Sequence, residues 1–129
     1  MSYYFSKNVI GKSFEEVESL VIEKLKEQGF GVITQIDMKN TFKTKLDVDF
    51  RPYKILGACN PKYAFNALSV DDKVGVMLPC NVCIQQKGEN DIEVFAVNPL
   101  VAMEAVQNPK VELLAKEITE KLNRVIESI

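Results

Sequence analysis

The chain has 129 residues, of which 47% are hydrophobic and 26% are charged, and its formal net charge at pH 7 is −2. This length suits one domain spanning residues 1–129 with one hydrophobic core, and the composition argues against disorder. Acidic and basic residues are mixed, whereas a nucleic-acid-binding protein more often has a basic face. No segment approaches the roughly 20 apolar residues that span a bilayer, and no signal peptide is visible. We therefore expect a cytoplasmic protein with neither nucleic-acid nor membrane partners.

The cysteine and histidine content narrows the possible chemistry. Cys59, Cys80 and Cys83 are an odd number of cysteines, and we expect free thiols in a reducing compartment. Histidine is absent, which removes histidine-based acid–base catalysis, histidine-containing triads and histidine-ligated metals. The chain also has no phosphate-binding loop, dinucleotide fingerprint or nucleophile elbow. We therefore expect neither a metal nor a cofactor.

The first part of the chain predicts a strand, a helix and a second strand. Residues 3–9 alternate β-branched or aromatic residues with others, which is typical of a strand. Ser13 and Glu16 form a capping box that predicts the start of a helix, and Gly29 is a natural residue to end it. The β-rich residues 31–36 predict the next strand.

The middle of the chain is partly ambiguous. Apolar residues within 38–46 have helical spacing, whereas those within 46–50 alternate as in a strand, so we expect a short helix followed by an extended stretch. Residues 53–59 are mainly apolar and predict a central strand. Asn60-Pro61 predicts the start of another helix, with asparagine at the N-cap, and the polar residues 71–73 end it.

The last part of the chain predicts three strands in succession and a long helix. The strands are expected at 74–78, 81–86 and 91–97, and the last two are joined by a hairpin turn. A short helical turn follows over 98–106, and an unbroken apolar stripe predicts a helix over 109–129 that must lie across a sheet. These elements indicate an α+β domain with an antiparallel or mixed sheet of about five to six strands. We expect its helices, including the long C-terminal one, to pack on one face.

Cys59 is the first candidate for a functional residue, because it ends a strand and directly precedes the helix start at Asn60. A helix N-terminus carries partial positive charge, which would lower the pKa of a thiol there. Its free N–H groups could also bind a carboxylate or phosphate. The alternative is that Cys59 is a small buried apolar residue, as free cysteines usually are.

Cys80 and Cys83 have the spacing of a C-x-x-C motif, but they fall on an expected strand. Residues i and i+3 of a strand point to opposite faces, so a dithiol or metal site would need a bulge or turn near Pro79. A structural zinc site would also need a fourth ligand in a chain without histidine. We therefore do not expect Cys83 to take part in a site.

Cys59 and Cys80 form a more informative pair, because each lies at or beside the end of a strand and is followed by an asparagine. If the two strand ends meet, Asn60 and Asn81 would add amide donors and acceptors to a pocket that contains the thiols. An asparagine after a strand is also a common cap or turn residue, so a purely structural interpretation stays open.

Arg51 and Gly57 are weaker candidates for ligand contacts. Arg51 is one of two arginines and could hold an anion, or it could pair with Asp47 or Asp49 on the surface. A glycine inside a strand, such as Gly57, indicates a bulge or a close approach by a ligand or partner.

Two motifs carry a resemblance to a known family. The run DFRPYKILGACNP (49–61), with Ala64, Ala67 and Leu68 after it, and LPCNV (78–82) further on resemble the signature of the domain-of-unknown-function 302 family. The similarity extends over nearly the whole chain. It implies a compact α+β domain that tends to form dimers, and the signature includes Cys59, Asn60, Cys80 and Asn81. Asp47 stands where a glycine is expected, and Cys83 stands where an aliphatic residue is usual.

Three functions are compatible with these features. The first is a homodimeric module that binds a small molecule or anion, such as an anionic metabolite, with Cys59, Asn60, Cys80, Asn81, Gly57 and Arg51 as candidate ligand contacts. The second is a thiol-dependent enzyme or redox sensor that uses Cys59 with Cys80. The third is a dimeric interaction module without a pocket. The separation and exposure of Cys59 and Cys80 discriminate among the three.

Overall fold

The computed structural model describes residues 1–129 and contains one five-stranded sheet. Each pair of neighbouring strands is antiparallel, so the predicted α+β fold with an antiparallel sheet is confirmed. The spatial order is β1-β5-β4-β3-β2, which places β4 at the centre and β1 and β2 at the edges. The strands are β1 (Tyr4–Ile10), β2 (Gly31–Asp37), β3 (Tyr53–Cys59), β4 (Cys80–Gly88) and β5 (Asp91–Val97).

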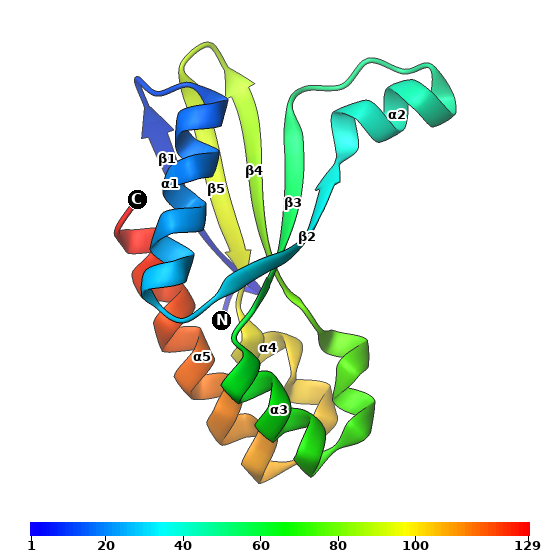
Figure 1. Ribbon diagram of the computed structural model, residues 1–129, viewed down its shortest axis with the longest axis vertical. Helices are drawn as coiled ribbons and strands as arrows, with labels where there is room; N and C mark the ends of the chain where they lie inside the picture. Colours follow the sequence, from blue (N-terminus) through cyan, green and yellow to red (C-terminus); the bar gives the residue numbers. More distant parts are fainter.

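The helices occupy three places around the sheet (Figure 1). Helices α1 and α5 cover one face, α3 and α4 stand beyond one end of the strands, and α2 projects from the other end. No helix is both long and apolar enough to cross a membrane. The α-helices are α1 (Phe14–Glu27), α2 (Met38–Leu46), α3 (Pro61–Val70), α4 (Pro99–Ala102) and α5 (Pro109–Glu127), and the 3₁₀ helices are η1 (Asp72–Met77) and η2 (Glu104–Val106).

The main core lies between the sheet and helices α1 and α5. Alternate residues of β4, such as Val82 and Ile84, are fully buried on this side and meet Leu25 of α1 and Leu122 of α5. Helix α1 begins with the predicted capping box, in which Ser13 Oγ accepts a hydrogen bond from the Glu16 amide over 3.1 Å. Both long helices therefore bury the apolar stripes that the sequence predicts.

The expected strand over 74–78 is wrong, because residues 74–77 belong to the 3₁₀ helix η1 and Leu78 is its C-cap. The Asp71 carboxylate accepts a hydrogen bond from the Lys73 amide over 3.0 Å and so caps this turn. Val74 is the one buried residue of η1, whereas Val76 is 84% exposed. One tight turn is enough to bury the single side chain of this apolar run. Two successive strands, β4 and β5, therefore follow α3, and not three.

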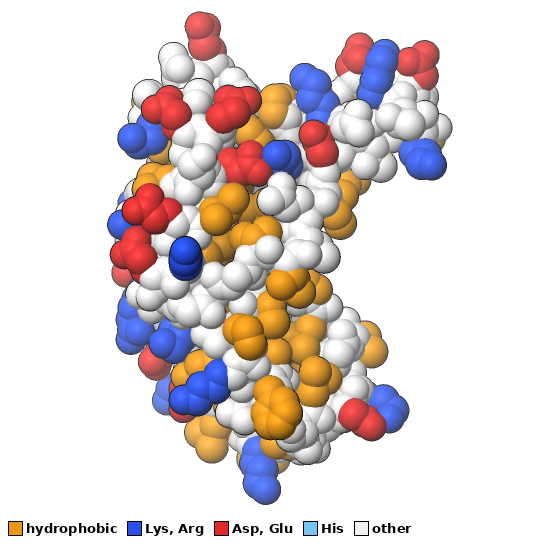
Figure 2. All heavy atoms as spheres, viewed as in Figure 1, with side chains coloured by type: hydrophobic (Ala, Val, Ile, Leu, Met, Phe, Trp, Pro, Cys, Tyr) orange, Lys and Arg blue, Asp and Glu red, His pale blue; other side chains and the backbone are white.

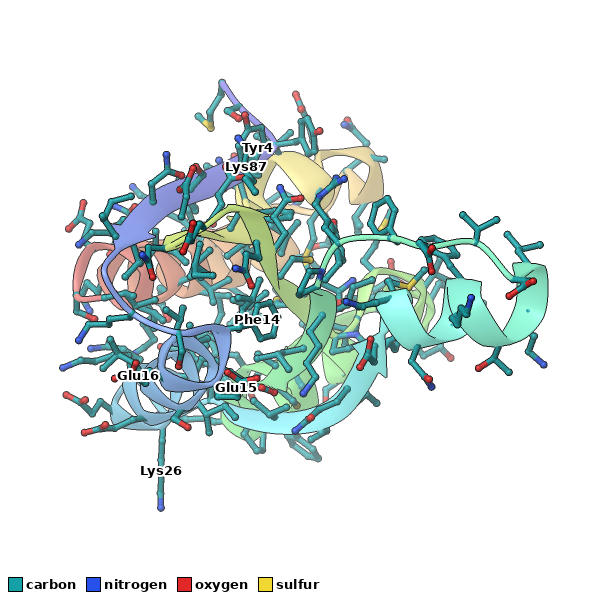
Figure 3. The ribbon with its side chains drawn as sticks, turned by 90° about the horizontal axis from the view of Figure 1, so that it is seen from above. Tyr4, Phe14, Glu15, Glu16, Lys26 and Lys87 are labelled. Carbon is teal, nitrogen blue, oxygen red and sulfur yellow. The ribbon has the colours of Figure 1, made fainter.

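The second face of the sheet has no long helix over it. In Figure 3, Tyr4 lies on the side of the sheet away from Glu15 and Glu16 of α1, and α2 extends outward. A row of aromatic rings crosses this side, with centroid separations of 5.1 Å for Phe42–Phe50, 6.1 Å for Phe50–Tyr53 and 6.0 Å for Tyr53–Phe95. We call this side the open face.

Candidate functional site

An apolar cavity of about 340 Å³ lies where the ends of β3 and β4 meet α3 and α5. Fourteen of its seventeen lining residues are hydrophobic, and none is charged. The volume falls within the range of small-molecule sites. The lining residues are Phe30, Ile33, Ala58, Cys59, Asn60, Tyr63, Ala64, Ala67, Leu68, Leu78, Pro79, Cys80, Pro99, Met103, Leu114, Ala115 and Ile118.

Strand pairing brings Cys59 and Cys80 to the same cavity. Ala58 is directly opposite Cys80 in the antiparallel pair of β3 and β4, so Cys59 is one residue from that position. Both cysteines line the cavity; Cys59 is half-buried and Cys80 is 8% exposed. The two sequence motifs, at 49–61 and 78–82, therefore both contribute to the wall of this cavity.

The cavity wall offers few polar groups. Asn60 and Tyr63 are the only lining residues whose side chains carry nitrogen or oxygen. The Asn60 amide donates to the Gln28 carbonyl over 3.3 Å, and a hydrogen bond to Glu117 raises the pKa of Tyr63. The wall therefore suits a ligand with an apolar body, and no arginine or lysine lines it to hold a multiply charged anion.

Asn60 occupies the N-cap position of α3, but its side chain does not cap the helix. The predicted helix start is confirmed, and only the side-chain capping bond is missing, because the Asn60 amide is turned toward the end of α1. The Asn60 nitrogen lies 3.1 Å from the position of a Cβ built on Gly29, the positive-φ glycine that follows α1. Asn60 therefore links α1 to α3 and leaves the first turn of α3 without a side-chain acceptor.

The thiol of Cys80 is protonated at neutral pH. Burial raises its pKa to about 11, and the neighbouring Cys59 adds to the shift. A thiol must ionise to act as a nucleophile, so Cys80 is poorly suited to attack a substrate or a disulfide.

Cys83 is separated from this cavity by the sheet. It forms a hydrogen bond with Tyr53, which belongs to the row of rings on the open face, and burial raises the pKa of Cys83 to about 11. Cys80 and Cys83 thus follow the alternation of a regular strand. No group of three or more acidic or thiol side chains is arranged to hold a metal ion.

Three other candidates lie outside the cavity lining. Asn81 is exposed and lines a separate hollow of about 190 Å³ beside Pro79. Gly57 is enclosed by side chains of its own sheet, because a Cβ there would lie 2.8 Å from Pro79 Cγ and would also meet Thr34. A close approach by the protein's own side chains, not by a ligand, therefore explains this glycine. Arg51 precedes β3, whereas the cavity lies at the far end of that strand.

Arg51 does not make the surface ion pair that we considered. Its Nε donates to Gln85 Oε1 over 2.8 Å, and its guanidinium lies 4.3 Å from the centroid of the Phe50 ring. Asp47 and Asp49 both lie near Lys43, with N–O distances of 2.9 and 3.5 Å. Arg51 therefore holds the loop before β3 against β4.

Several cavity residues come from distant segments, and no pattern in the sequence predicts that they line a cavity. The first turns of α5 contribute Leu114, Ala115 and Ile118, and the α4 region contributes Pro99 and Met103. The apolar stripe of α5 is visible in the sequence. The spacing of its residues is the same whether they face a packed core or a cavity, so the stripe does not reveal the cavity.

Together the fold and the cavity define a small α+β domain with a largely apolar hollow at one end of an antiparallel sheet. The family model described as Domain of unknown function DUF302 matches residues 5–129, so the chain belongs to this family. The structure is similar to the crystal structure of an uncharacterized conserved DUF302 protein from Bacillus stearothermophilus, with 25% sequence identity and a TM-score of 0.89 over 98% of each chain. None of the curated proteins matches the chain.

Proposed function

We propose that this protein is a binding module for a small molecule that has an apolar body and one polar or anionic group. The proposed site is the cavity at Cys59, Asn60 and Cys80. One observation carries the proposal: a cavity of about 340 Å³ has fourteen hydrophobic residues among its seventeen lining residues. An apolar pocket with a few polar groups is the usual form of a small-molecule site.

The start of α3 is the proposed contact for the polar group. Asn60 lines the cavity, and its side chain makes no capping hydrogen bond to α3. Backbone N–H groups in the first helical turn have no partner within the helix, and they favour negative charge. A carboxylate or hydroxyl oxygen of the ligand would accept from them, which is how the site would take a small anionic metabolite.

A thiol-dependent enzyme or redox sensor is less well supported. Such a function needs an accessible thiolate, whereas Cys80 is 8% exposed and burial raises its pKa to about 11. The free cysteines fit the reducing cytoplasm, which is the location we propose.

Binding of 8-anilinonaphthalene-1-sulfonate tests the proposed site, because this dye joins an apolar body to one anionic group. We expect saturable fluorescence with one dye molecule per chain in the cavity. Ala64→Phe, which places a ring into the lining, should weaken this binding at least tenfold. Ala105→Phe is the matched control, since Ala105 is exposed and does not line the cavity. Equal binding to both variants and the wild type, with native circular dichroism spectra, would overturn the proposal.

We also propose that the protein acts as a homodimer through its open face. Tyr4, Ile10 and Ile36 of the edge strands are 42%, 71% and 46% exposed, and α2 has no buried residue. Leu46 and Val48 at the end of α2 are 65% and 48% exposed. A nine-residue helix is marginal without packing. These five exposed side chains would form the apolar part of an interface, and a standard interface buries about 800 Å² per partner.

A second copy is the occupant that this face suits, because a two-fold axis would place each α2 against the other open face. Analytical ultracentrifugation of the wild type should therefore show a dimer at micromolar concentration. Ile36→Glu should yield monomers, whereas Leu113→Glu should not, because Leu113 is 65% exposed and belongs to α5, which covers the other face of the sheet. A monomeric wild type, or a dimeric Ile36→Glu variant, would contradict the proposal.

A further inference from the structure

We infer that the ligand of the cavity is an unbranched aliphatic chain of about twelve carbon atoms with a polar group at one end. The chain would enter between Ile33 and Leu68 and extend toward α4 and α5. This inference rests on the proposed binding function and names the chemical class of its ligand. Four features of the cavity support it.

The exposure of the lining residues defines a mouth and an inner end. Ile33 and Leu68 are 61% and 40% exposed, whereas Pro99, Ala115 and Ile118 are buried. Ile33 lies at a register shift between Val32 and Thr34, where β2 departs from regular pairing with β3. Such bulges re-aim side chains, and this one sets an exposed aliphatic side chain at the mouth.

The wall is shaped by small and flexible residues and not by flat rings. Four alanines, three leucines and Met103 line it, together with two isoleucines and two prolines. The rotatable bonds of the leucines and Met103 allow them to follow a flexible chain. Only Phe30 and Tyr63 contribute aromatic rings, and Phe30 is 3% exposed within the main core. No pair of exposed rings is available to hold a planar ligand between them.

The cavity volume sets the length of the chain. A dry apolar cavity of about 150 Å³ holds one benzene molecule, which has six carbon atoms. The cavity of about 340 Å³ is a little more than twice as large. It therefore accommodates about twelve carbon atoms.

The surface beside the mouth is also apolar. Phe65 and Val70 of α3 and Val76 of η1 are 72%, 38% and 84% exposed, and η1 packs on α3 near Leu68. Figure 2 shows hydrophobic side chains gathered over this part of the molecule. An apolar surface next to an apolar pocket suits a ligand that is poorly soluble in water.

Calorimetric titration with saturated monocarboxylates of six to sixteen carbons, below their micelle concentrations, tests the inference. We expect the affinity to rise about fourfold per added methylene, the gain from burying one such group, and to stop rising near twelve carbons. Met103→Ala, which enlarges the inner end, should move this limit to longer chains, and Ala115→Leu should move it to shorter ones. Ala105→Leu should leave the limit unchanged, since Ala105 does not line the cavity.

Matching alcohols and compact probes complete the experiment. A dependence on chain length in both the acid and the alcohol series supports the inference. Tighter binding of 1-adamantanol or 2-naphthol than of decanol, or an affinity that does not change with chain length, overturns it while leaving the binding function intact. If neither these compounds nor the anionic dye binds, the proposed function itself fails.

Discussion

The ring of Pro79 packs against Gly57 on the neighbouring strand, so closely that a Cβ on Gly57 would lie 2.8 Å from Pro79 Cγ. Gly57 is paired with Asn81 on one side and with Thr34 on the other. Three strands therefore meet tightly just before β3 reaches the cavity. This contact joins the two sequence motifs and fixes how the ends of β3 and β4 approach each other.

Gly57→Ala should destabilise the protein, because the added methyl group would overlap both the proline ring and the Thr34 side chain. Overpacking of this kind costs about 1–3 kcal/mol. Urea unfolding followed by circular dichroism would measure the loss as a lower midpoint at an unchanged slope.

Gly31→Ala is the matched control for this substitution. Gly31 lies on the adjacent strand, and a Cβ there would meet nothing within 4 Å. We expect a change within about 0.5 kcal/mol. Equal losses for the two variants would show that the Gly57–Pro79 contact is not tight in solution.

Most of the fold could be predicted from local signals in the sequence. The capping box at Ser13 and Glu16 and the stripe of α5 mark helices that the structure contains. The strand predicted over 74–78 is wrong for a physical reason. Valines favour strands, but Asp71 caps a tight turn at this place, and Val74 is the one residue of the turn that is buried. The residues that pack around Val74 decide whether this segment forms a strand or a turn. These residues lie elsewhere in the chain, so the local sequence does not reveal the outcome.

The candidate site could be predicted only in part. The motifs indicate that Cys59, Asn60 and Cys80 belong to one region, but the apolar character of the cavity depends on α4 and α5. The position of Asn81 depends on the register that sets Cys80 opposite Ala58. Register and helix docking are long-range properties, so no local pattern reveals them.

Stability should fall as the pH rises from about 9 to about 11. Cys80 and Cys83 have an ordinary pKa of 9.0, which burial raises to about 11 in the folded protein. Between these values the unfolded chain loses these protons first, so unfolding becomes more favourable by up to about 1.4 kcal/mol per pH unit for each thiol. Urea unfolding at several pH values would measure the slope.

Cys80→Ala isolates the contribution of one thiol. The variant should lose about half of the thiol-dependent slope above pH 9, whatever its stability at neutral pH. The comparison is between the pH slopes of the wild type and the variant. The cost of the deleted sulfur does not depend on pH, and Tyr53, whose pKa burial also raises, is present in both proteins, so neither affects the difference in slope. Identical slopes in the wild type and the variant would rule out a buried, protonated Cys80.

The ion pair between Glu18 and Lys54 should contribute more than a surface pair. Lys54 Nζ lies 3.0 and 2.9 Å from the two carboxylate oxygens of Glu18, and the side chains are only 26% and 15% exposed. A double-mutant cycle with Glu18→Gln and Lys54→Met should give a coupling free energy of about 1 kcal/mol. The same cycle on Asp72 and Lys73, which are 80% and 84% exposed, should give a few tenths at most. Equal couplings would mean that the pair between α1 and β3 is fully solvated.

Asn98→Ala should be the most destabilising of the asparagine substitutions, because Asn98 is the one fully buried polar residue, at 2% exposure. Its amide donates to the Ser2 carbonyl over 3.1 Å, and its Oδ1 accepts from the Leu100 amide over 3.2 Å and from Thr119 Oγ1 over 3.4 Å. Removing this side chain breaks three part-buried hydrogen bonds, each of which contributes about 0.5–1.5 kcal/mol. Thermal unfolding would measure it.

The position of Asn98 also connects stability to the cavity. Asn98 precedes Pro99, a buried part of the cavity wall, and through Thr119 it ties α4 to α5. The Leu100 amide also donates to Thr119 Oγ1 over 3.1 Å, and this hydroxyl loses its own acceptor in Asn98→Ala. Hydrogen exchange at the Leu100 amide should therefore speed up in this variant, and binding of the anionic dye should weaken with it. Asn108→Ala, which removes a single capping bond to Lys110 at the start of α5, should cost only about 1 kcal/mol and leave Leu100 protected. Rapid exchange at Leu100 in the wild type would show instead that α4 opens freely and that the wall is not held by Asn98.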